Sequence, residues 1–334
     1  MNPANEPSHR GSWKHWHTDE LPLRLGVSSC LLGEEVRYDG GHARDRFVAE
    51  SLDRWAEWVP VCPEVEVGMP IPRPTIRLVE VGEEQRLIAP STGGDFTAEM
   101  QGYSAVRVGQ LQAAGLDGYV LKKNSPSCGM ERLPVYRGEQ RAHKRGVGLF
   151  AAELMRRWPE LPVEEEGRLN DPALRENFIV RVFCRNRWRA AAARGWSRSR
   201  LVDFHTAHKL LLRAHHEEGY RELGRIVARF GQLPDRELYA AYELEFQATL
   251  RHKTSAKANV NVLQHAMGYL KEQLDSAEKQ YLLEAIEDYR SGLLPLIVPV
   301  SLLRFLIRKF EISYLLDQIY FDPHPKEMML RNQG

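Results

Sequence analysis

Residues 158–172 divide the sequence into two parts with different hydrophobic patterns. This stretch, WPELPVEEEGRLNDP, contains three prolines, a glycine and an acidic run, and it predicts a linker. Before it, short β-type runs alternate with helix-like stretches, whereas long patterns with a 3.6-residue period follow it. We therefore expect an α/β fold. An N-terminal three-layer domain with a mainly parallel sheet occupies residues 21–160, and a mostly α-helical C-terminal domain occupies residues 173–322.

The length and composition are those of a chain that can bury a large core. The sequence has 334 residues, of which 43% are hydrophobic and 27% are charged, and this size suits two domains. The first twenty residues are polar and lack the apolar segment of a secretory signal. The most apolar run, residues 293–307, contains two prolines and Arg304 and is shorter than the roughly 20 residues of a membrane helix. We expect a cytoplasmic protein with no membrane partner.

Three of the four cysteines follow β-type runs in the first part. Cys30 ends RLGVSSC, Cys62 ends WVPVC, and Cys128 follows YVL after a turn. The carboxyl ends of parallel strands lie at one side of a sheet, so we expect these thiols to converge. Two interpretations stay open at this point. The thiols either pack as small buried hydrophobes or hold a metal or cluster, for which thiolates are suitable soft ligands.

Four sequence blocks span most of the first part. They are VSSCLLGEEVRYDGG, VCPEVEVGMPIPRP, STGGDFT and LKKNSPSCG, in that order between residues 26 and 129. Together they resemble the signature blocks of the thiouracil desulfidase family. The resemblance implies a 4Fe-4S cluster that is held by Cys30, Cys62 and Cys128 and leaves one iron position open.

The second part has a resemblance of its own. The stretches FHTAHKLLLRAHHEEGYRELGRIVARF and HKTSAKANVNVLQHAMGYLKEQL are similar to the helical domain that is fused to this module in tRNA 4-thiouridine desulfidases. The two resemblances imply an enzyme that removes sulfur from 4-thiouridine in tRNA and gives uridine and sulfide without net redox change. Its partners are then tRNA and a thiolated pyrimidine.

Two side chains beside the cysteines are predicted to be catalytic. Ser125 precedes Cys128 by three residues, and Glu64 follows Cys62 by two. Attack of water on a C–S carbon that a Lewis acid polarises needs a proton acceptor. We expect Ser125 to position the base or the water, and Glu64 to transfer a proton. The alternatives are that Ser125 only caps its turn and that Glu64 pairs with a structural arginine such as Arg73.

The basic charge of the second part is concentrated in one stretch. Residues 175–213 hold 10 Lys and Arg against 2 Asp and Glu, with aromatic residues between them. Such a stretch suits a polyanion, because arginines contact phosphates and rings stack on unpaired bases. Alternatively, the arginines are merely solvated and the aromatic rings face the core. The predicted RNA-binding residues are Arg181, Arg185, Arg187, Arg189, Lys253 and Lys257.

Other functions are compatible with the same residues. Three cysteines could hold zinc instead of iron. The substrate could be a free thiopyrimidine base, in which case the helical domain would serve stability or assembly. A non-catalytic RNA-binding redox sensor is a further class. Cys184 lies outside the four blocks, and we expect it to pack in a core rather than to act as a fourth ligand.

Overall fold

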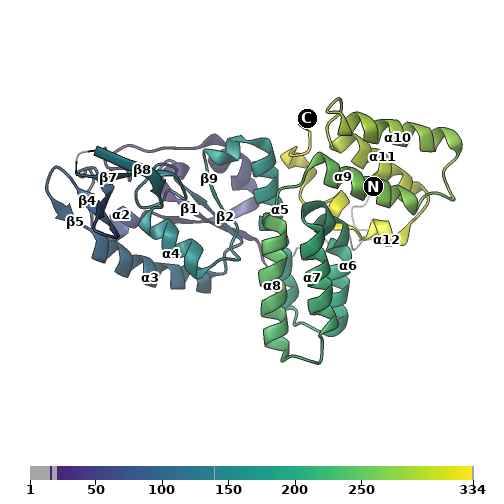
Figure 1. The fold of residues 1–334 in the computed structure, drawn as a ribbon, viewed down its shortest axis with the longest axis horizontal. Helices are drawn as coiled ribbons and strands as arrows, with labels where there is room; N and C mark the ends of the chain where they lie inside the picture. Colours follow the sequence, from purple (N-terminus) through teal and green to yellow (C-terminus); the bar gives the residue numbers. More distant parts are fainter. Residues whose placement is uncertain (1–15, 17–20, 139, 333–334) are drawn as a thin grey trace. The chain divides into compact units, whose positions relative to one another are not determined.

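The computed structural model describes residues 16, 21–138 and 140–332, which form two compact units. Of the described residues, the α/β unit comprises those in the range 22–171, and the helical unit comprises residues 172–332 with Trp16 and Leu21 (Figure 1). Apart from Trp16, the N-terminal segment on which the absence of a secretory signal was predicted lies outside the described residues. Within the part of the chain that is described, no helix has the length and apolar content needed to cross a membrane.

A four-stranded parallel sheet forms the centre of the α/β unit. Strand β1 (Leu23–Ser28) pairs in parallel with β2 (Ala56–Val61) and with β6 (Gly118–Leu121), and β6 pairs in parallel with β9 (Val163–Glu165). The strand order is β2-β1-β6-β9. All four residues of β6 are buried, as expected of an inner strand with both faces covered. The predicted mainly parallel sheet is confirmed.

A second, five-stranded sheet extends the same unit, with the order β5-β4-β3-β7-β8. Only β3 and β7 pair in parallel, and the remaining pairs are antiparallel. The sequence analysis did not predict this sheet, because its strands carry many charged residues on their exposed positions. The strands are β3 (Arg77–Val81), β4 (Glu84–Ala89), β5 (Gly94–Asp95), β7 (Leu133–Arg137) and β8 (Gln140–Gly146).

Two helices pack against each other and against the sheets. These are α3 (Thr97–Ala114) and α4 (Leu149–Arg157), and Figure 1 shows them side by side. Their buried residues share one core with apolar residues of both sheets. The shorter elements are η2 (Ser29–Leu32), η3 (Phe47–Leu52), η4 (Asp53–Trp55), α2 (Pro63–Glu66) and η5 (Arg168–Asn170).

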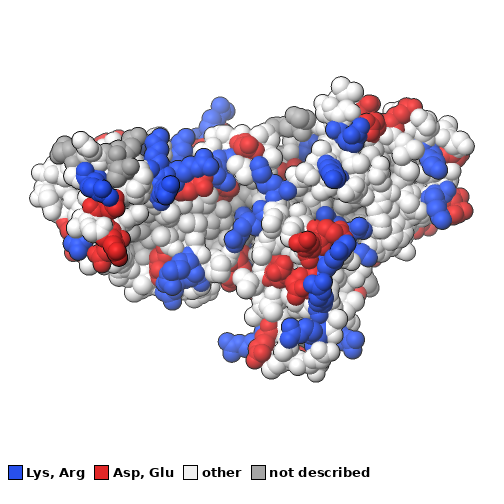
Figure 2. All heavy atoms as spheres, in the orientation of Figure 1, with Lys and Arg blue, Asp and Glu red and all other residues white. Residues whose placement is uncertain are grey.

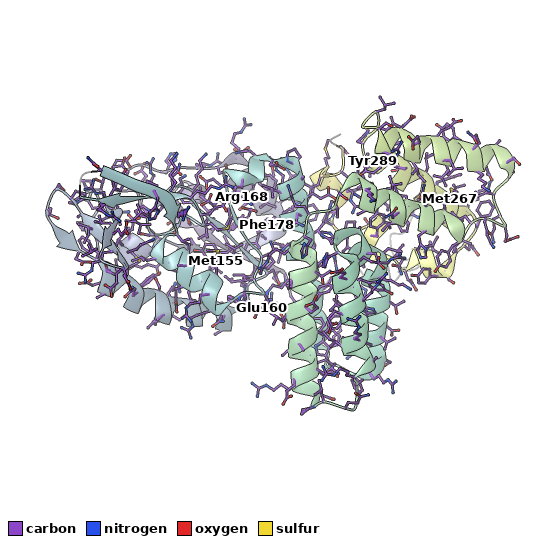
Figure 3. The ribbon with its side chains drawn as sticks, viewed as in Figure 1. Met155, Glu160, Arg168, Phe178, Met267 and Tyr289 are labelled. Carbon is purple, nitrogen blue, oxygen red and sulfur yellow. The ribbon has the colours of Figure 1, made fainter. Side chains whose placement is uncertain are left out.

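The segment predicted as a linker belongs to the parallel sheet. Its residues 163–165 form β9, and Glu164, Glu165 and Glu166 are all buried. The Arg168 guanidinium, labelled in Figure 3, pairs with the Glu164 carboxylate at 2.5 Å. The linker prediction is therefore wrong. Local composition indicated a flexible stretch, but the pairing partner β6 lies some forty residues earlier in the chain and was not visible in the local pattern.

The second unit is helical, as predicted. Serine or aspartate side chains cap three of its helices, and at α10 Asp275 and Glu278 form a reciprocal capping box. The helices are α5 (Pro172–Ala193), α6 (Arg198–His215), α7 (Glu217–Ala228), α8 (Asp235–Arg251), α9 (Ala256–Gly268), α10 (Ser276–Arg290), α11 (Ile297–Lys309) and α12 (Ser313–Leu316), followed by η6 (Ile319–Phe321) and η7 (Lys326–Met328).

Candidate functional site

Three neighbouring strand ends deliver the three cysteines to one edge of the parallel sheet. Cys30 lies in η2 directly after β1, Cys62 follows β2, and Cys128 lies in the turn after β6. Because β1 pairs with both β2 and β6, the carboxyl ends of these strands are adjacent. The predicted convergence of the thiols is confirmed.

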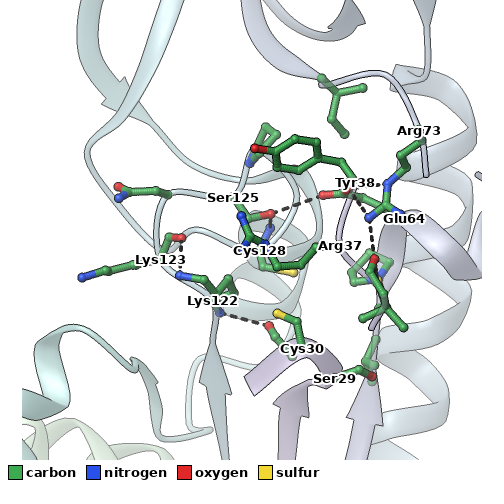
Figure 4. A pocket seen from close by; sticks show the side chains of 18 of the residues that line it. Ser29, Cys30, Arg37, Tyr38, Glu64, Arg73, Lys122, Lys123, Ser125 and Cys128 are labelled. Carbon is green, nitrogen blue, oxygen red and sulfur yellow. Dashed lines mark hydrogen bonds and ion pairs between the residues drawn. The ribbon is translucent and has the colours of Figure 1, made fainter. Parts of the chain in front are cut away.

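The thiols line a pocket of about 410 Å³ (Figure 4). Cys30 and Cys128 are buried, with 8% and 5% of their surface exposed. Burial raises the pKa of the Cys30 thiol to about 11 and raises the pKa of Cys128 well above its usual value. Cys62 and Cys30 also raise the pKa of Cys128 through their charges, so the three sulfur atoms lie within electrostatic range of one another.

The chemistry of the donor set fits an iron–sulfur cluster. Thiolates are soft ligands that iron–sulfur clusters and zinc both accept. The three cysteines line one pocket, so together they could hold such a group. The donors therefore fit the cluster that the sequence resemblance implies.

The turn that carries Cys128 is tightly held. The Ser125 hydroxyl oxygen accepts hydrogen bonds from the backbone N–H of Ser127 at 3.2 Å and of Cys128 at 3.1 Å. The N–H of Gly129 donates to the Ser125 carbonyl at 2.7 Å. A side chain at Gly129 would meet that carbonyl oxygen at 2.9 Å and a Leu133 methyl group at 2.5 Å, so the turn requires glycine there. Ser125 thus makes the bonds of the alternative in which it caps its turn, and its catalytic role stays a prediction.

Glu64 connects this turn to the strand end that carries Cys62. Its Oε1 accepts hydrogen bonds from the hydroxyls of Ser127 at 3.1 Å and of Ser125 at 3.4 Å. Its Oε2 accepts from Nε and Nη2 of Arg73 at 2.9 and 2.7 Å. The predicted pairing of Glu64 with Arg73 is therefore also confirmed. Since Glu64 and Ser125 line the pocket together with the thiols, these structural bonds orient the two side chains that were predicted to be catalytic.

Comparison with known proteins assigns the family. The family model described as 2-thiouracil desulfurase matches residues 25–166. The uncharacterized protein YbbK of Bacillus subtilis (strain 168) is 32% identical over 151 residues, which cover 43% of this chain and 97% of YbbK. A solved structure described as the 4Fe-4S-dependent thiouracil desulfidase TudS is 33% identical, with a TM-score of 0.38, and the match covers 47% of this chain and 99% of that one. The chain belongs to the 2-thiouracil desulfurase family.

A second family model matches part of the helical unit, and a second relative matches about half of the chain. The family model described as a protein of unknown function (DUF1722) matches residues 209–325. The uncharacterized protein YbgA of Escherichia coli (strain K12) is 30% identical over 160 residues, which cover 48% of this chain and 95% of YbgA. The predicted relation of the helical unit to tRNA 4-thiouridine desulfidases stays a prediction.

Sequence reasoning missed an ion pair in the pocket wall. Lys122 lines the pocket, and its ammonium group lies 2.5 Å from the Glu166 carboxylate. The second oxygen of Glu166 accepts the backbone N–H of Lys123 at 2.7 Å. Lys122 was visible in the block LKKNSPSCG, but Glu166 was hidden because its segment was interpreted as a linker.

The helical unit buries most of the arginines that were predicted to contact RNA. Arg181, Arg185 and Arg187 are exposed to only 6%, 5% and 0%. Arg185 pairs with Glu243 at 2.9 Å, and Arg187 donates to the Pro323 carbonyl at 2.8 Å. The RNA-binding prediction for these three arginines is therefore corrected, because side chains that bond the protein interior cannot reach a phosphate.

The reason lies in how α5 is packed. Every residue from Asn177 to Trp188 is buried, so the helix has no solvated basic face. The ring of Trp188 stacks on Tyr242 with centroids 5.2 Å apart, which confirms that the aromatic residues face the core. Cys184 is fully buried in the same core, as predicted.

The other predicted RNA-binding residues are more accessible. Lys253 and Lys257 are exposed, and Arg189 is half-buried. On the face shown in Figure 2, acidic side chains lie beside the basic ones over the helical unit. The helical unit also contains ion pairs such as Arg213 with Glu217 and Arg225 with Glu222. The basic side chains of the helical unit therefore do not form a continuous stripe on that face.

Proposed function

We propose that this protein removes sulfur from thiolated pyrimidines by hydrolysis. The observation that carries the proposal is the pocket in which Cys30, Cys62 and Cys128 meet Glu64 and Ser125. Membership of the 2-thiouracil desulfurase family supports it, as does the 33% identity to a chain described as a 4Fe-4S-dependent thiouracil desulfidase.

Cys30, Cys62 and Cys128 would hold the 4Fe-4S cluster. When bound, the cluster supplies an open iron position that accepts a soft thiocarbonyl sulfur and, as a Lewis acid, makes the C–S carbon more electrophilic. Three protein ligands suit this role because a fourth would close that position. The Ser28 hydroxyl, which hydrogen-bonds the Cys128 thiol, would orient one of the ligands.

In this proposal Glu64 accepts a proton from the attacking water. Arg73 engages only Oε2 of Glu64, while Oε1 is turned toward the serine hydroxyls. The side chain of Arg73 is 3% exposed and also donates to the Val36 carbonyl at 2.8 Å, so its position is fixed. We infer that Arg73 orients the carboxylate, that Ser125 positions the water, and that Glu64 takes up the proton.

The pocket wall also offers a surface for the pyrimidine ring. Tyr38 lines the pocket and is 41% exposed, so one part of its ring remains available for stacking on a base. The Arg37 guanidinium lies 5.5 Å from the centre of the same ring, and the Arg73 N–H donates to the Tyr38 carbonyl at 2.9 Å. These contacts hold the Tyr38 segment beside Glu64.

Among thiolated pyrimidines, the specific substrate in this proposal is 4-thiouridine in cytoplasmic tRNA. The resemblance of the helical part to tRNA 4-thiouridine desulfidases supports it, and exposed Lys253 and Lys257 supply cations that could contact phosphates. Arg189 is the remaining candidate from α5. The buried arginines of that helix take no part in this proposal.

An anaerobic assay of the iron–sulfur-reconstituted protein tests the function. We expect loss of the thiobase near-ultraviolet absorbance together with one sulfide released per base, and no turnover by Cys128→Ala. Cys184→Ala, which removes a thiol from the helical core, is the matched control and should retain activity. Comparing 2-thiouracil, 4-thiouridine and 4-thiouridine-containing tRNA separates a free-base enzyme from a tRNA enzyme. An intact cluster without turnover of any of the three would refute the proposal and favour a redox sensor.

A further inference from the structure

Lys122 is a charged residue in the pocket wall to which the proposed reaction assigns no role. Its side chain is 21% exposed, and that of its partner Glu166 is 8% exposed. Removing two such ions from water costs more free energy than forming an ion pair at the surface. Replacing a buried ion pair by apolar residues of similar volume often leaves stability unchanged or increases it. Stability alone therefore does not explain why the fold places an ion pair here.

Several bonds fix the position of the ammonium group. Glu166 Oε1 lies 2.5 Å from Nζ of Lys122, and the Lys123 carbonyl accepts a second N–H at 3.2 Å. The backbone N–H of Lys122 donates to the Ser28 hydroxyl at 3.0 Å, which ties the residue to the end of β1. The Glu166 N–H donates to the Leu121 carbonyl at 3.2 Å and holds the carboxylate beside β6.

These bonds leave one donor for a ligand. An ammonium group carries three N–H donors, and the two bonds above use two of them. Among the described residues, no protein acceptor takes the third. Lys122 and Cys30 line the same pocket, and Figure 4 labels them next to each other. The remaining N–H therefore belongs to a residue of the pocket that holds the thiols.

Hydrolytic desulfidation produces an anion in this pocket. A C–O bond forms to water, the C–S bond breaks, and its electron pair leaves with the sulfur. The products are the carbonyl base and hydrosulfide, which keeps one proton of the water, while the other passes through Glu64 to solvent. Arg73 is paired with Glu64, so Lys122 is a cation of the pocket wall whose ammonium still has a donor to offer to the departing anion.

We propose that Lys122, held by Glu166, donates a hydrogen bond to the sulfur as it leaves the base as hydrosulfide. This inference rests on the proposed function, since it names the group that receives the product of that reaction. A fixed ammonium donor lowers the free energy of an anion that forms beside it. It also slows the return of hydrosulfide to solvent until another ligand replaces it.

The test is an anaerobic titration of the reconstituted holoprotein with sodium sulfide, followed by visible absorbance. Lys122→Met alone would leave Glu166 buried without its partner, so the informative variant is Lys122→Met with Glu166→Gln. We expect this double variant to raise the dissociation constant for sulfide about 10-fold or more, the loss typical of a hydrogen bond to a charged group. Lys122→Arg should stay within about threefold of wild type, because it keeps the charge and the donors.

Lys144→Met is the matched control, because it removes an exposed ammonium of the same unit, outside the pocket, and leaves the ion pair intact. Its sulfide affinity should equal that of wild type. If the double variant binds sulfide as wild type does while the wild type desulfidates thiouracil, the inference fails and the proposed function stands. If the wild type neither releases sulfide from a thiobase nor binds it, both fail.

Discussion

The wall of the thiol pocket and the interior of helix α5 both bury charged side chains, but they satisfy them differently. In the pocket, Arg73 with Glu64 and Lys122 with Glu166 form pairs that still present atoms to a cavity. In α5, Arg187 donates to a backbone carbonyl inside a packed core. Buried charge thus indicates chemistry where it borders a cavity, and packing specificity where protein atoms surround it.

The largest effect that separates the two regions should come from the thiols. Cys128→Ala should reduce thiobase turnover by well over the roughly 10–100-fold that outer residues of metal sites contribute. Cys184→Ala should change turnover by less than about threefold, since it affects only the core of the helical unit and the bond from Arg187 there. Iron content and sulfide release measure both. Equal loss in the two variants would remove the distinction between pocket and core.

The next effect concerns Glu64. Glu64→Gln keeps an acceptor for Arg73 but removes the proton acceptor, so kcat should fall by about 10²–10⁴-fold. The cluster absorbance should stay close to that of wild type, whereas the thermal stability should fall because buried Arg73 loses its charge partner. Single-turnover kinetics with 2-thiouracil provide the measurement. Wild-type kcat in this variant would show that Glu64 serves only to hold Arg73.

In the helical unit, an arginine substitution should act on stability instead. Arg187→Met leaves the Pro323 carbonyl without its donor, and the free energy of unfolding should fall by about 1–3 kcal/mol for that buried group. Lys257→Met, at an exposed position, should stay within about 0.5 kcal/mol. Urea unfolding measures both. Normal stability of Arg187→Met together with weaker tRNA binding would restore the predicted arginine face.

Sequence reasoning identified the thiol pocket because strand order makes distant positions adjacent in a predictable way. Cys30, Cys62 and Cys128 each followed a β-type run, and parallel pairing brought those ends together. Arg73 could also be predicted as the partner of Glu64, because the two residues lie only nine positions apart in the sequence. Glu166 was not, since β9 is only three residues long and its acidic, proline-flanked sequence is typical of a linker.

The error in α5 has a different physical origin. A count of arginines reports charge but not the direction of each side chain. In α5 apolar and charged residues are buried all around the helix, so no amphipathic period marked an exposed face. Partners such as Glu243 and the Pro323 carbonyl lie 58 and 136 residues away in sequence. Only the tertiary structure shows that the charges were already satisfied.

A smaller effect concerns pH in the helical unit. Burial lowers the pKa of His215 to about 4, while an unfolded histidine titrates near 6.5. Between these values the unfolded state binds the extra proton, so the free energy of unfolding should fall as the pH drops from 6.5 to 4. The slope is about 1.4 kcal/mol per pH unit for one such group. His215→Gln should lower the measured slope by about 1.4 kcal/mol per pH unit, which corresponds to the uptake of one proton. An unchanged slope would show that His215 does not contribute.

The most direct test of the hydrolytic function is the origin of the oxygen in the product. The reconstituted protein is incubated anaerobically with 2-thiouracil in water labelled with oxygen-18, and the base is analysed by mass spectrometry while sulfide is counted. Hydrolysis predicts one labelled oxygen in the uracil and one sulfide per base converted. Sulfide release without the label, or an unchanged thiobase in the presence of an intact cluster, would contradict the function proposed for this pocket.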